Sequence, residues 1–274
     1  MGGVEQQLPA DLRLNAIVVH RGGSNLLRGV NVNAPGANGL RPDPLSGAVT
    51  EIQSTATSTV DLISVNLNLA KPQQRIFVAA SYTFSRSTDE TDSPFGLPAD
   101  SYNLAAERGP ALNDARHRFM SLVNLPLRKR FRFASSARVQ SALPYNITTG
   151  RDDNGDTVSN DRPAGVARNS GRGSAQVDVG LRLSWSLGFG GAAPPPAGPQ
   201  VRIVRSDNAD PLGSIGGMDA QSKRYAIDLY AQAYNALNHV NALNYSGVLT
   251  SPFFGRATSA SSPRRIEIGA RLVF

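Results

Sequence analysis

One short acidic segment has the residue types and spacing of a cation site. In the sequence DDNGDTVSND, Asp152, Asn154 and Asp156 occupy positions one, three and five, and Asp161 follows further on. Alternate oxygen-bearing residues at the start of such a loop converge on one Ca²⁺ ion. The pattern breaks at the twelfth position, where Pro163 replaces the expected bidentate Glu. Two interpretations stay open, a calcium site and a polar loop rich in turn-forming residues.

The sequence offers no comparable pattern for catalysis. The three histidines (His20, His117 and His239) are far apart, and neither a His-Glu-x-x-His motif, a Gly-x-Ser-x-Gly elbow nor a phosphate-binding glycine loop occurs. His117 stands between two arginines at a strand start, where a residue at the rim of the fold is expected rather than a catalytic one. We expect a protein that is not an enzyme and that needs no cofactor beyond the candidate calcium.

Composition narrows the class of protein. The 274 residues are 40% hydrophobic and 18% charged, with no run of about 18 apolar residues that could form a spanning helix. The lack of such a run does not exclude transmembrane β-strands, because each needs only about ten alternating residues. The absence of cysteine removes disulfides and thiol chemistry. The net charge of +7 is carried by scattered arginines rather than by one stripe, so nucleic-acid binding is not expected.

Alternation with period two dominates the chain and predicts antiparallel β-strands. The clearest example puts Val177, Leu181 and Trp185 on one face, with Asp178 and Arg182 on the other. About eight such strands are predicted, at residues 12–20, 49–52 and more firmly 60–69, 75–85, 116–125, 131–139, 175–187, 225–237 and 264–274. The fold class is therefore all-β.

The connections between these strands alternate in length. Short turns are predicted at residues 71–74 and 127–130, whereas four long loops are predicted at 21–48, 86–115, 141–174 and 239–263. Outer-membrane barrels have short turns on the periplasmic side and long loops outside. A Gly- and Pro-rich flexible insertion at residues 188–222 falls on the short-turn side and is an exception.

The last eleven residues, RRIEIGARLVF, predict a two-faced strand that ends on an aromatic residue. Gly269, Leu272 and Phe274 form a pattern that resembles the terminal signal read by the outer-membrane barrel-assembly machinery. From this segment alone, the terminal strand of a soluble β-sandwich is an equal alternative. The strand faces and the loop lengths favour an antiparallel transmembrane β-barrel segment.

Three stretches resemble the C-terminal part of the TonB-dependent outer-membrane receptors, in particular the Oar-like subgroup with a carboxypeptidase-regulatory-like domain. They are FVAASYTFSRSTDETDSPF (77–95), the run from 109 to 170, and YNALNHVNALNYSGVLTSPFFGRATSASSPRRIEIGARLVF (234–274). The resemblance implies an outer-membrane barrel of about 22 strands with a plug and a TonB-binding motif. Residues 1–274 match only the last third of such a barrel. Because the first residues lack a secretory signal, we expect the chain to be a piece of a longer protein.

The functional expectation is ligand uptake or binding at the outer membrane by the full-length protein. The implied partners are outer-membrane lipid, the barrel-assembly machinery and, only through upstream regions, TonB. Surface adhesion without transport is the alternative. A third hypothesis is a small closed barrel of eight strands, in which the first and last strands pair. The sequence does not identify the substrate.

Overall fold

The computed structural model describes residues 1–128, 130–192 and 223–273. Within these ranges the chain is built of strands and short 3₁₀ turns, and the all-β prediction is confirmed. No helix in the described ranges is long and apolar enough to cross a membrane. The strands of the main sheet are β1 (Gly2–Leu8), β2 (Leu12–Asn31), β3 (Thr50–Lys71), β4 (Ile76–Asp89), β5 (Gly109–Pro110), β6 (His117–Arg128), β7 (Phe131–Gln140), β10 (Gln176–Ala192), β11 (Lys223–Tyr234) and β14 (Arg265–Val273).

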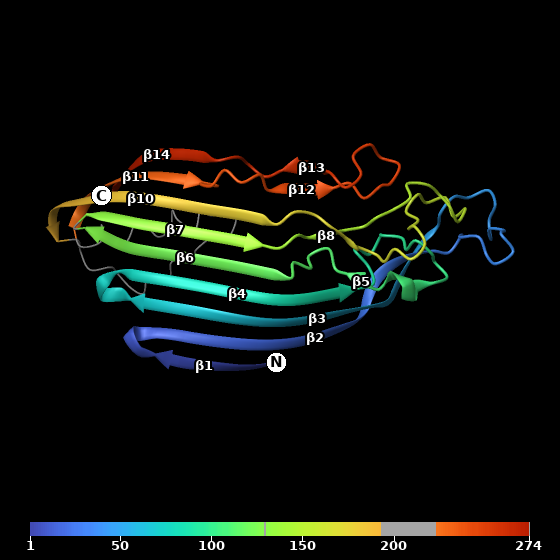
Figure 1. Cartoon of the computed structure of the whole chain (residues 1–274), viewed down its shortest axis with the longest axis horizontal. Helices are drawn as coiled ribbons and strands as arrows, with labels where there is room; N and C mark the ends of the chain where they lie inside the picture. The colour runs from blue at the N-terminus through green and yellow to red at the C-terminus, as the bar shows by residue number, and fades with distance from the viewer. Residues whose placement is uncertain (129, 193–222, 274) are drawn as a thin grey trace.

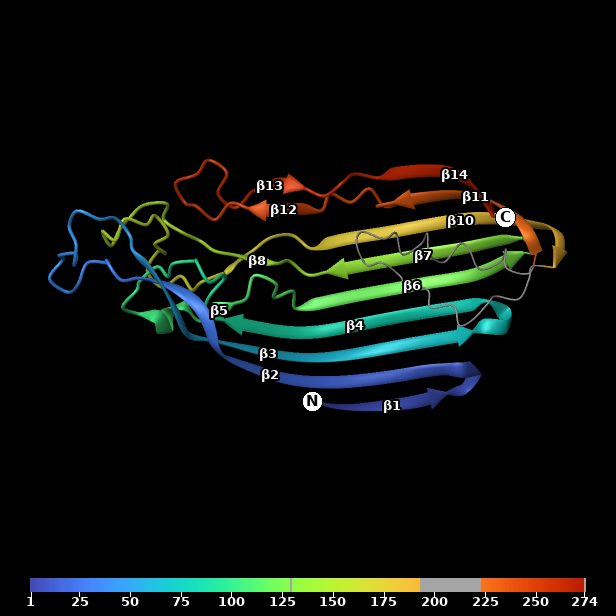
Figure 2. The same ribbon diagram turned by 180° about the vertical axis from the view of Figure 1, so that it is seen from behind.

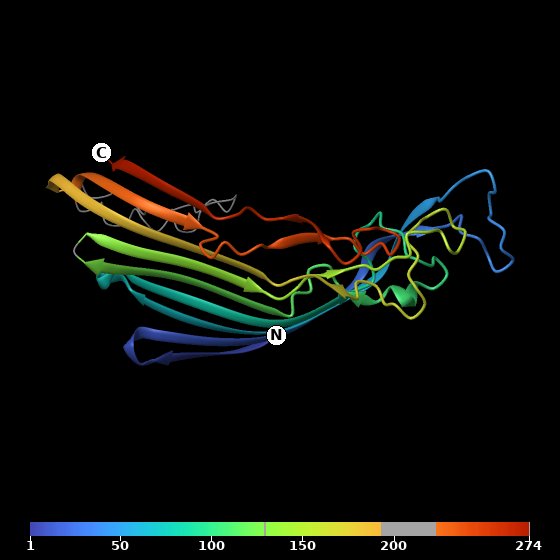
Figure 3. The same cartoon turned by 45° about the horizontal axis from the view of Figure 1, so that its top comes forward.

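The main sheet is one antiparallel meander. Its order is β1-β2-β3-β4-β6-β7-β10-β11-β14, and the two-residue β5 pairs with the end of β4. Neighbours in the chain are therefore neighbours in the sheet, which is the simplest topology for an up-and-down barrel wall. The sheet curls into an open wall with β1 and β14 at its two edges (Figures 1 and 3).

The two ends of the sheet differ, as the loop lengths predict. At one end lie the 3₁₀ turns η1 (Pro9–Asp11) and η2 (Pro72–Gln74) and the tight connection between β6 and β7. The long connections gather at the opposite end, as Figure 2 shows from behind. They include η3 (Leu104–Glu107) and two small hairpins, formed by β8 (Pro144–Tyr145) with β9 (Gly171–Arg172) and by β12 (Ala242–Tyr245) with β13 (Ala257–Ala260).

Apolar side chains cover one face of the sheet, here called the outer face. The register aligns Val18, Ile63 and Phe84 in one row across β2, β3 and β4, and all three are exposed. On the last strand Ile268 is 85% exposed. A row of exposed aliphatic and aromatic side chains is costly in water but matches the lipid-facing side of a barrel.

The opposite inner face is polar, and the described chain has almost no apolar core. The single core cluster in the described ranges is Ala134 with the half-buried Leu122. Polar side chains are instead among the most buried, including Asn31, Asp114 and Gln232. This arrangement reverses that of a soluble domain, whose interior is apolar.

Two predicted boundaries are wrong because a bulge was read as a loop. β2 does not end at residue 20 but continues to Asn31, and β3 is one strand rather than two segments. Between Gly23 and Leu27 the register shifts, and Asn25 takes a left-handed conformation with φ 57°. Glycine-rich sequence inside a strand marks a bulge as readily as it marks a loop.

The strand count is also corrected. The sequence did not predict β1, whose residues GGVEQQL have little β-propensity and are held by a seven-residue register with β2. The continuous path therefore has nine strands instead of about eight. β1 and β14 do not pair with each other in the described ranges, so the hypothesis of a small closed barrel is wrong.

Of the predicted insertion, residues 188–192 belong to β10, whose bounds are Gln176–Ala192. Residues 193–222 lie outside the described residues, so the predicted flexibility of the insertion stays a prediction. The same holds for Phe274, the last residue of the terminal pattern.

Candidate functional site

A ladder of neutral polar side chains crosses the inner face. Ser81 Oγ on β4 donates a hydrogen bond of 2.7 Å to Asn66 Oδ1 on β3. Asn66 Nδ2 in turn lies 3.4 Å from Asn15 Oδ1 on β2. These residues follow from the register, which pairs Asn15 with Asn66 and Asn66 with Ser81. A ladder of amide and hydroxyl groups can both donate to and accept from a polar partner.

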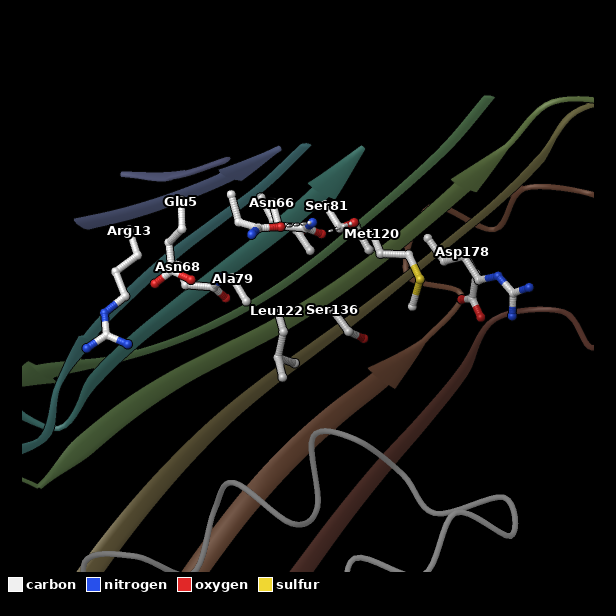
Figure 4. Close-up of a pocket in the computed structure, with 15 residues that line it drawn as sticks. Glu5, Arg13, Asn66, Asn68, Ala79, Ser81, Met120, Leu122, Ser136 and Asp178 are labelled. Atoms are coloured by element: carbon white, nitrogen blue, oxygen red, sulfur yellow. Dashed lines mark hydrogen bonds between the residues drawn. The ribbon is translucent and has the colours of Figure 1, made fainter. Parts of the chain in front are cut away.

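The ladder lines a hollow of about 850 Å³ on the inner face. Its side chains come from β1, β2, β3, β4, β6, β7 and β10. In Figure 4, Met120 and Leu122 add an apolar strip beside the polar ladder. Charged residues stand on both sides of the strip, Glu5 and Arg13 on β1 and β2, and Asp178 on β10. The wall therefore offers hydrogen bonds, apolar contact and charges to a bound partner.

Gly269 has a packing role that the sequence did not reveal. It lies opposite Tyr230 in the register of β11 and β14. A Cβ atom at Gly269 would lie 2.5 Å from atoms of the Tyr230 side chain, so any larger residue would force that ring to move. The Arg182 guanidinium lies 3.9 Å from the centre of the same ring, a cation–π distance.

Of the other two residues of the terminal pattern, Leu272 is described and Phe274 is not. Leu272 faces outward, is 61% exposed and pairs with Ile227. The role of the pattern as an assembly signal stays a prediction.

Three arginines of the connection between β7 and β10 hold the long-loop end together. Arg162 forms a bidentate ion pair with Glu107, in which Nη1 donates to Oε2 at 3.0 Å and Nη2 donates to Oε1 at 2.8 Å. Arg168 is buried and ion-paired with Asp89 and Asp92. Both arginines reach carboxylates on the end of β4 and the connection that follows it. Bidentate and multiply hydrogen-bonded arginines fix geometry more tightly than lysines do.

Arg172 makes the third of these ion pairs, and its partner Asp114 is fully buried. Burial acts to raise the pKa of Asp114. The hydrogen bonds donated by Arg172, the Ser87 backbone and Arg116 outweigh that effect and hold the pKa of Asp114 below its ordinary value. Sequence reasoning missed all three arginines because their partners lie 55 to 79 residues away in the chain.

The acidic segment 152–161 folds as a tight loop against the neighbouring connections. Both oxygens of Asp152 accept backbone hydrogen bonds, from Asp156 and Thr157, each at 2.9 Å. Asp161 Oδ2 accepts from the Asp153 backbone at 2.7 Å. These contacts are those of a loop rich in turn-forming residues. In the described part of the chain, no group of three or more His, Asp or Glu side chains is arranged as a metal centre. Calcium binding by this loop stays a prediction.

The three histidines lie apart, each with its own neighbour. His20 Nδ1 lies 2.6 Å from Asp61 Oδ1 on the exposed outer face. His117 is the first residue of β6, at the rim of the sheet, and its Nδ1 lies 2.7 Å from the Tyr82 hydroxyl. His239 approaches Asn241. These positions agree with the prediction of a rim residue for His117.

An open antiparallel wall with an apolar outer face, a polar inner face and unequal ends defines the class of outer-membrane barrel proteins. The family model described as "Outer membrane beta barrel domain" matches residues 2–267, so the chain belongs to this family and its location is the bacterial outer membrane. A comparison with curated proteins found no match.

Two solved structures share the fold. The outer membrane transporter YddB from Escherichia coli matches with a TM-score of 0.57 and 12% identity, covering 99% of this chain and 31% of that one. The ferric-catecholate import receptor Fiu from E. coli K12 matches with a TM-score of 0.51 and 10% identity, covering 99% of this chain and 26% of that one. The chain thus spans about a third or less of the length of either protein.

Proposed function

We propose that residues 1–274 form the C-terminal wall segment of a larger TonB-dependent receptor-like barrel of the Oar-like subgroup. In the full-length protein this barrel takes up or binds a ligand at the outer membrane. The sequence resemblance over three stretches supports the subgroup, and the fold shared with one transporter and one import receptor supports the class. The chain's share of their lengths agrees with a partial barrel.

The observation that carries the proposal is the pair of open edges. β1 has β2 as its single neighbour in the sheet and β14 has β11, within the described residues. An open sheet edge in hydrocarbon leaves backbone N–H and C=O groups without partners, at several kcal/mol per group. Further strands must pair with both edges before the sheet can be stable in a membrane. Upstream sequence is the natural source of those strands.

The unequal ends set the orientation that we propose. The short turns face the periplasm and the long connections face outside, as in other barrels of this class. The interlocked long loops then meet the ligand first, and the inner wall with Asn15, Asn66 and Ser81 borders its path. TonB would act through upstream regions, and the barrel-assembly machinery would recognise the terminal strand.

The experiment is cysteine accessibility in the full-length protein in isolated outer membranes. Asn66→Cys on the inner face should react with a membrane-impermeant maleimide once the plug is displaced by denaturant. Val65→Cys on the outer face of the same strand should react only with a lipid-soluble maleimide. Equal reaction of both variants with the impermeant reagent would contradict a membrane wall. The upstream sequence must also contain a plug and a TonB-binding motif.

Surface adhesion is the second candidate function, and the interlocked loop end favours it. Three ion pairs, each with at least one buried partner, give that end a fixed shape, which would serve a contact with another surface as well as ligand capture. An upstream region without plug and TonB-binding motif would favour adhesion over transport.

A further inference from the structure

The side chain of Asp156 is buried without being fully satisfied. It is 1% exposed, and its Oδ1 accepts a hydrogen bond of 2.8 Å from the Val158 backbone. Its Oδ2 is buried and has no hydrogen-bond partner. The same loop also carries the carboxylates of Asp152 and Asp161. A buried carboxylate oxygen with like charges around it is costly unless a cation or a proton neutralises it.

Other oxygen-bearing side chains of the same loop lie near Asp156. Asn154, Asp156 and Asp161 line one cavity between the long connections. Asp161 Oδ2 accepts hydrogen bonds from the backbones of residues 153 and 154, so the loop closes back on its own start. Thr157, the sixth position counted from Asp152, has a φ of 71°. The sixth position of a calcium loop makes the same sharp turn, for which glycine is usual.

Contacts from outside hold this loop in place. Asn31 Nδ2 donates to the Asp156 carbonyl at 3.0 Å, and Asn154 Nδ2 donates to the Ala99 carbonyl at 2.8 Å. Because Asn154 Nδ2 is hydrogen-bonded to the Ala99 carbonyl, Asn154 Oδ1 faces the loop. There it accepts a hydrogen bond of 2.9 Å from the Asp156 backbone N–H. The oxygen atoms of the loop are therefore positioned by residues far away in the chain.

The arginines near the loop do not neutralise it. Arg162 lines the same cavity, but its guanidinium is bound to both oxygens of Glu107. Arg41 approaches the loop, but it donates to the Gly155 and Ser46 carbonyls rather than to a carboxylate. Among the described residues no ion pair joins Asp152, Asp156 or Asp161 to a basic side chain, so an external cation or a proton can balance their negative charge.

We propose that the loop 152–161 binds one Ca²⁺ ion, with Asp156 as the central ligand and with Asn154 and Asp161 as neighbouring ligands. The carboxylates do not form a ready-made centre, which agrees with the hydrogen-bonded oxygens of Asp152. Calcium does not require three preassembled carboxylates, since it also accepts amide, backbone carbonyl and water oxygens in flexible geometry. Mg²⁺ demands a near-ideal octahedron and is the poorer match. The proposal does not depend on what the barrel transports.

The test is trypsin cleavage after the exposed Arg151, in the full-length protein in isolated outer membranes, with CaCl₂ or with a chelator. Calcium at about five times the dissociation constant should slow cleavage about sixfold, because bound ligand lowers the open population by that factor. Dissociation constants of extracellular calcium modules are about 10⁻⁴–10⁻³ M, so the CaCl₂ series should extend to several times that range. Equal concentrations of MgCl₂ should protect much less.

The decisive variant is Asp156→Asn, and the matched control is Asp153→Asn. Calcium should no longer protect Asp156→Asn from trypsin. In chelator this variant should be as resistant to trypsin as the native protein, because removal of the Asp156 charge relieves its repulsion with Asp152 and Asp161. Asp153→Asn removes the same charge from an exposed side chain that does not line the cavity, and its calcium response should be unchanged. The proposal would be overturned by any of three results: a cleavage rate that does not change with calcium, calcium protection that persists in Asp156→Asn, or equal protection by Mg²⁺.

Discussion

Arg172 Nη2 lies 2.7 Å from Asp114 Oδ2, and the Asp114 side chain has no exposure to solvent. The two residues are 58 positions apart and belong to two different long connections. Arg172 also donates to the Asp114 carbonyl at 2.6 Å. One side chain therefore fixes both the backbone and the carboxylate of the neighbouring connection, so the loop end of the barrel is a folded unit with a defined surface.

Removal of the Asp114 carboxylate should loosen this unit without unfolding the wall. Asp114→Ala leaves the Ser87 backbone N–H and the two arginines without their common acceptor. We expect loop docking to become about 1–3 kcal/mol less favourable. The cost stays in this range because Arg172 is partly exposed, so water can replace the lost carboxylate as its hydrogen-bond partner. Faster amide hydrogen exchange in residues 109–116 and 162–172 measures the effect.

The matched control is Arg265→Ala, which removes the exposed pair of Arg265 and Glu267. Exposed pairs contribute about 0–1 kcal/mol, so exchange in the long connections should not change. Unchanged exchange in Asp114→Ala as well would show that the buried pair does not hold the loops.

Acid should loosen the same unit. Because the pKa of Asp114 is held below its ordinary value in the folded protein, the ionised carboxylate favours docking at pH values above the unfolded pKa of about 3.9. That contribution is lost as the pH falls through the lower, folded pKa. Hydrogen exchange of the loop end should accelerate in that range relative to the strands. In Asp114→Asn the contribution of this group to the pH dependence should be absent.

Charges on the two faces of β3 should have unequal effects. Val65 faces outward and Asn66 faces the inner hollow. Val65→Arg near the middle of the wall should cost about 2–4 kcal/mol in lipid. Asn66→Arg should cost about 1 kcal/mol, mainly through the lost hydrogen bond with Ser81. Urea unfolding of the full-length protein in lipid vesicles compares the two, and equal costs would contradict the assigned faces.

The terminal strand allows packing to be separated from assembly. Gly269→Ala should destabilise the folded barrel by about 1–3 kcal/mol, because the added methyl group meets the Tyr230 ring. Deletion of Phe274 should instead lower the amount of protein in the outer membrane and leave the stability of the assembled fraction unchanged. Membrane fractionation and thermal melting measure the two quantities. Normal outer-membrane levels after the deletion would argue against an assembly signal.

Cross-linking should report the order of the strands. Ala16 on β2 lies opposite Val65 on β3, whereas Ala270 lies on β14 at the far edge. Cysteines at Ala16 and Val65 should be joined by a short thiol cross-linker. Cysteines at Ala16 and Ala270 should remain unlinked in the full-length protein. A cross-link between cysteines at these two positions would support the hypothesis of a small closed barrel.

Local patterns determined the strands and the difference between their faces. Ile266, Ile268 and Leu272 alternate with polar residues, and the alternation itself assigns them to one face because successive side chains of a strand point to opposite sides. The two short turns also favour antiparallel pairing of the strands that they join, whereas the order across the long connections came from the structure. The bulge near Asn25 and the extra strand β1 could not be read, because pairing with a partner outweighs weak local propensity there.

The tertiary structure alone decided what the loops do. Arg168 meets Asp89 across 79 positions, and Asn31 meets the Asp156 carbonyl across 125. Such contacts depend on how several strands place their ends in space, and no local periodicity encodes that placement. Side-chain alternation and loop lengths were enough to predict a two-faced antiparallel wall with unequal ends. The open edges, the interlocked loops and the buried, unpaired oxygen of Asp156 became visible only when the strands were assembled, because each is a relation between segments far apart in the chain.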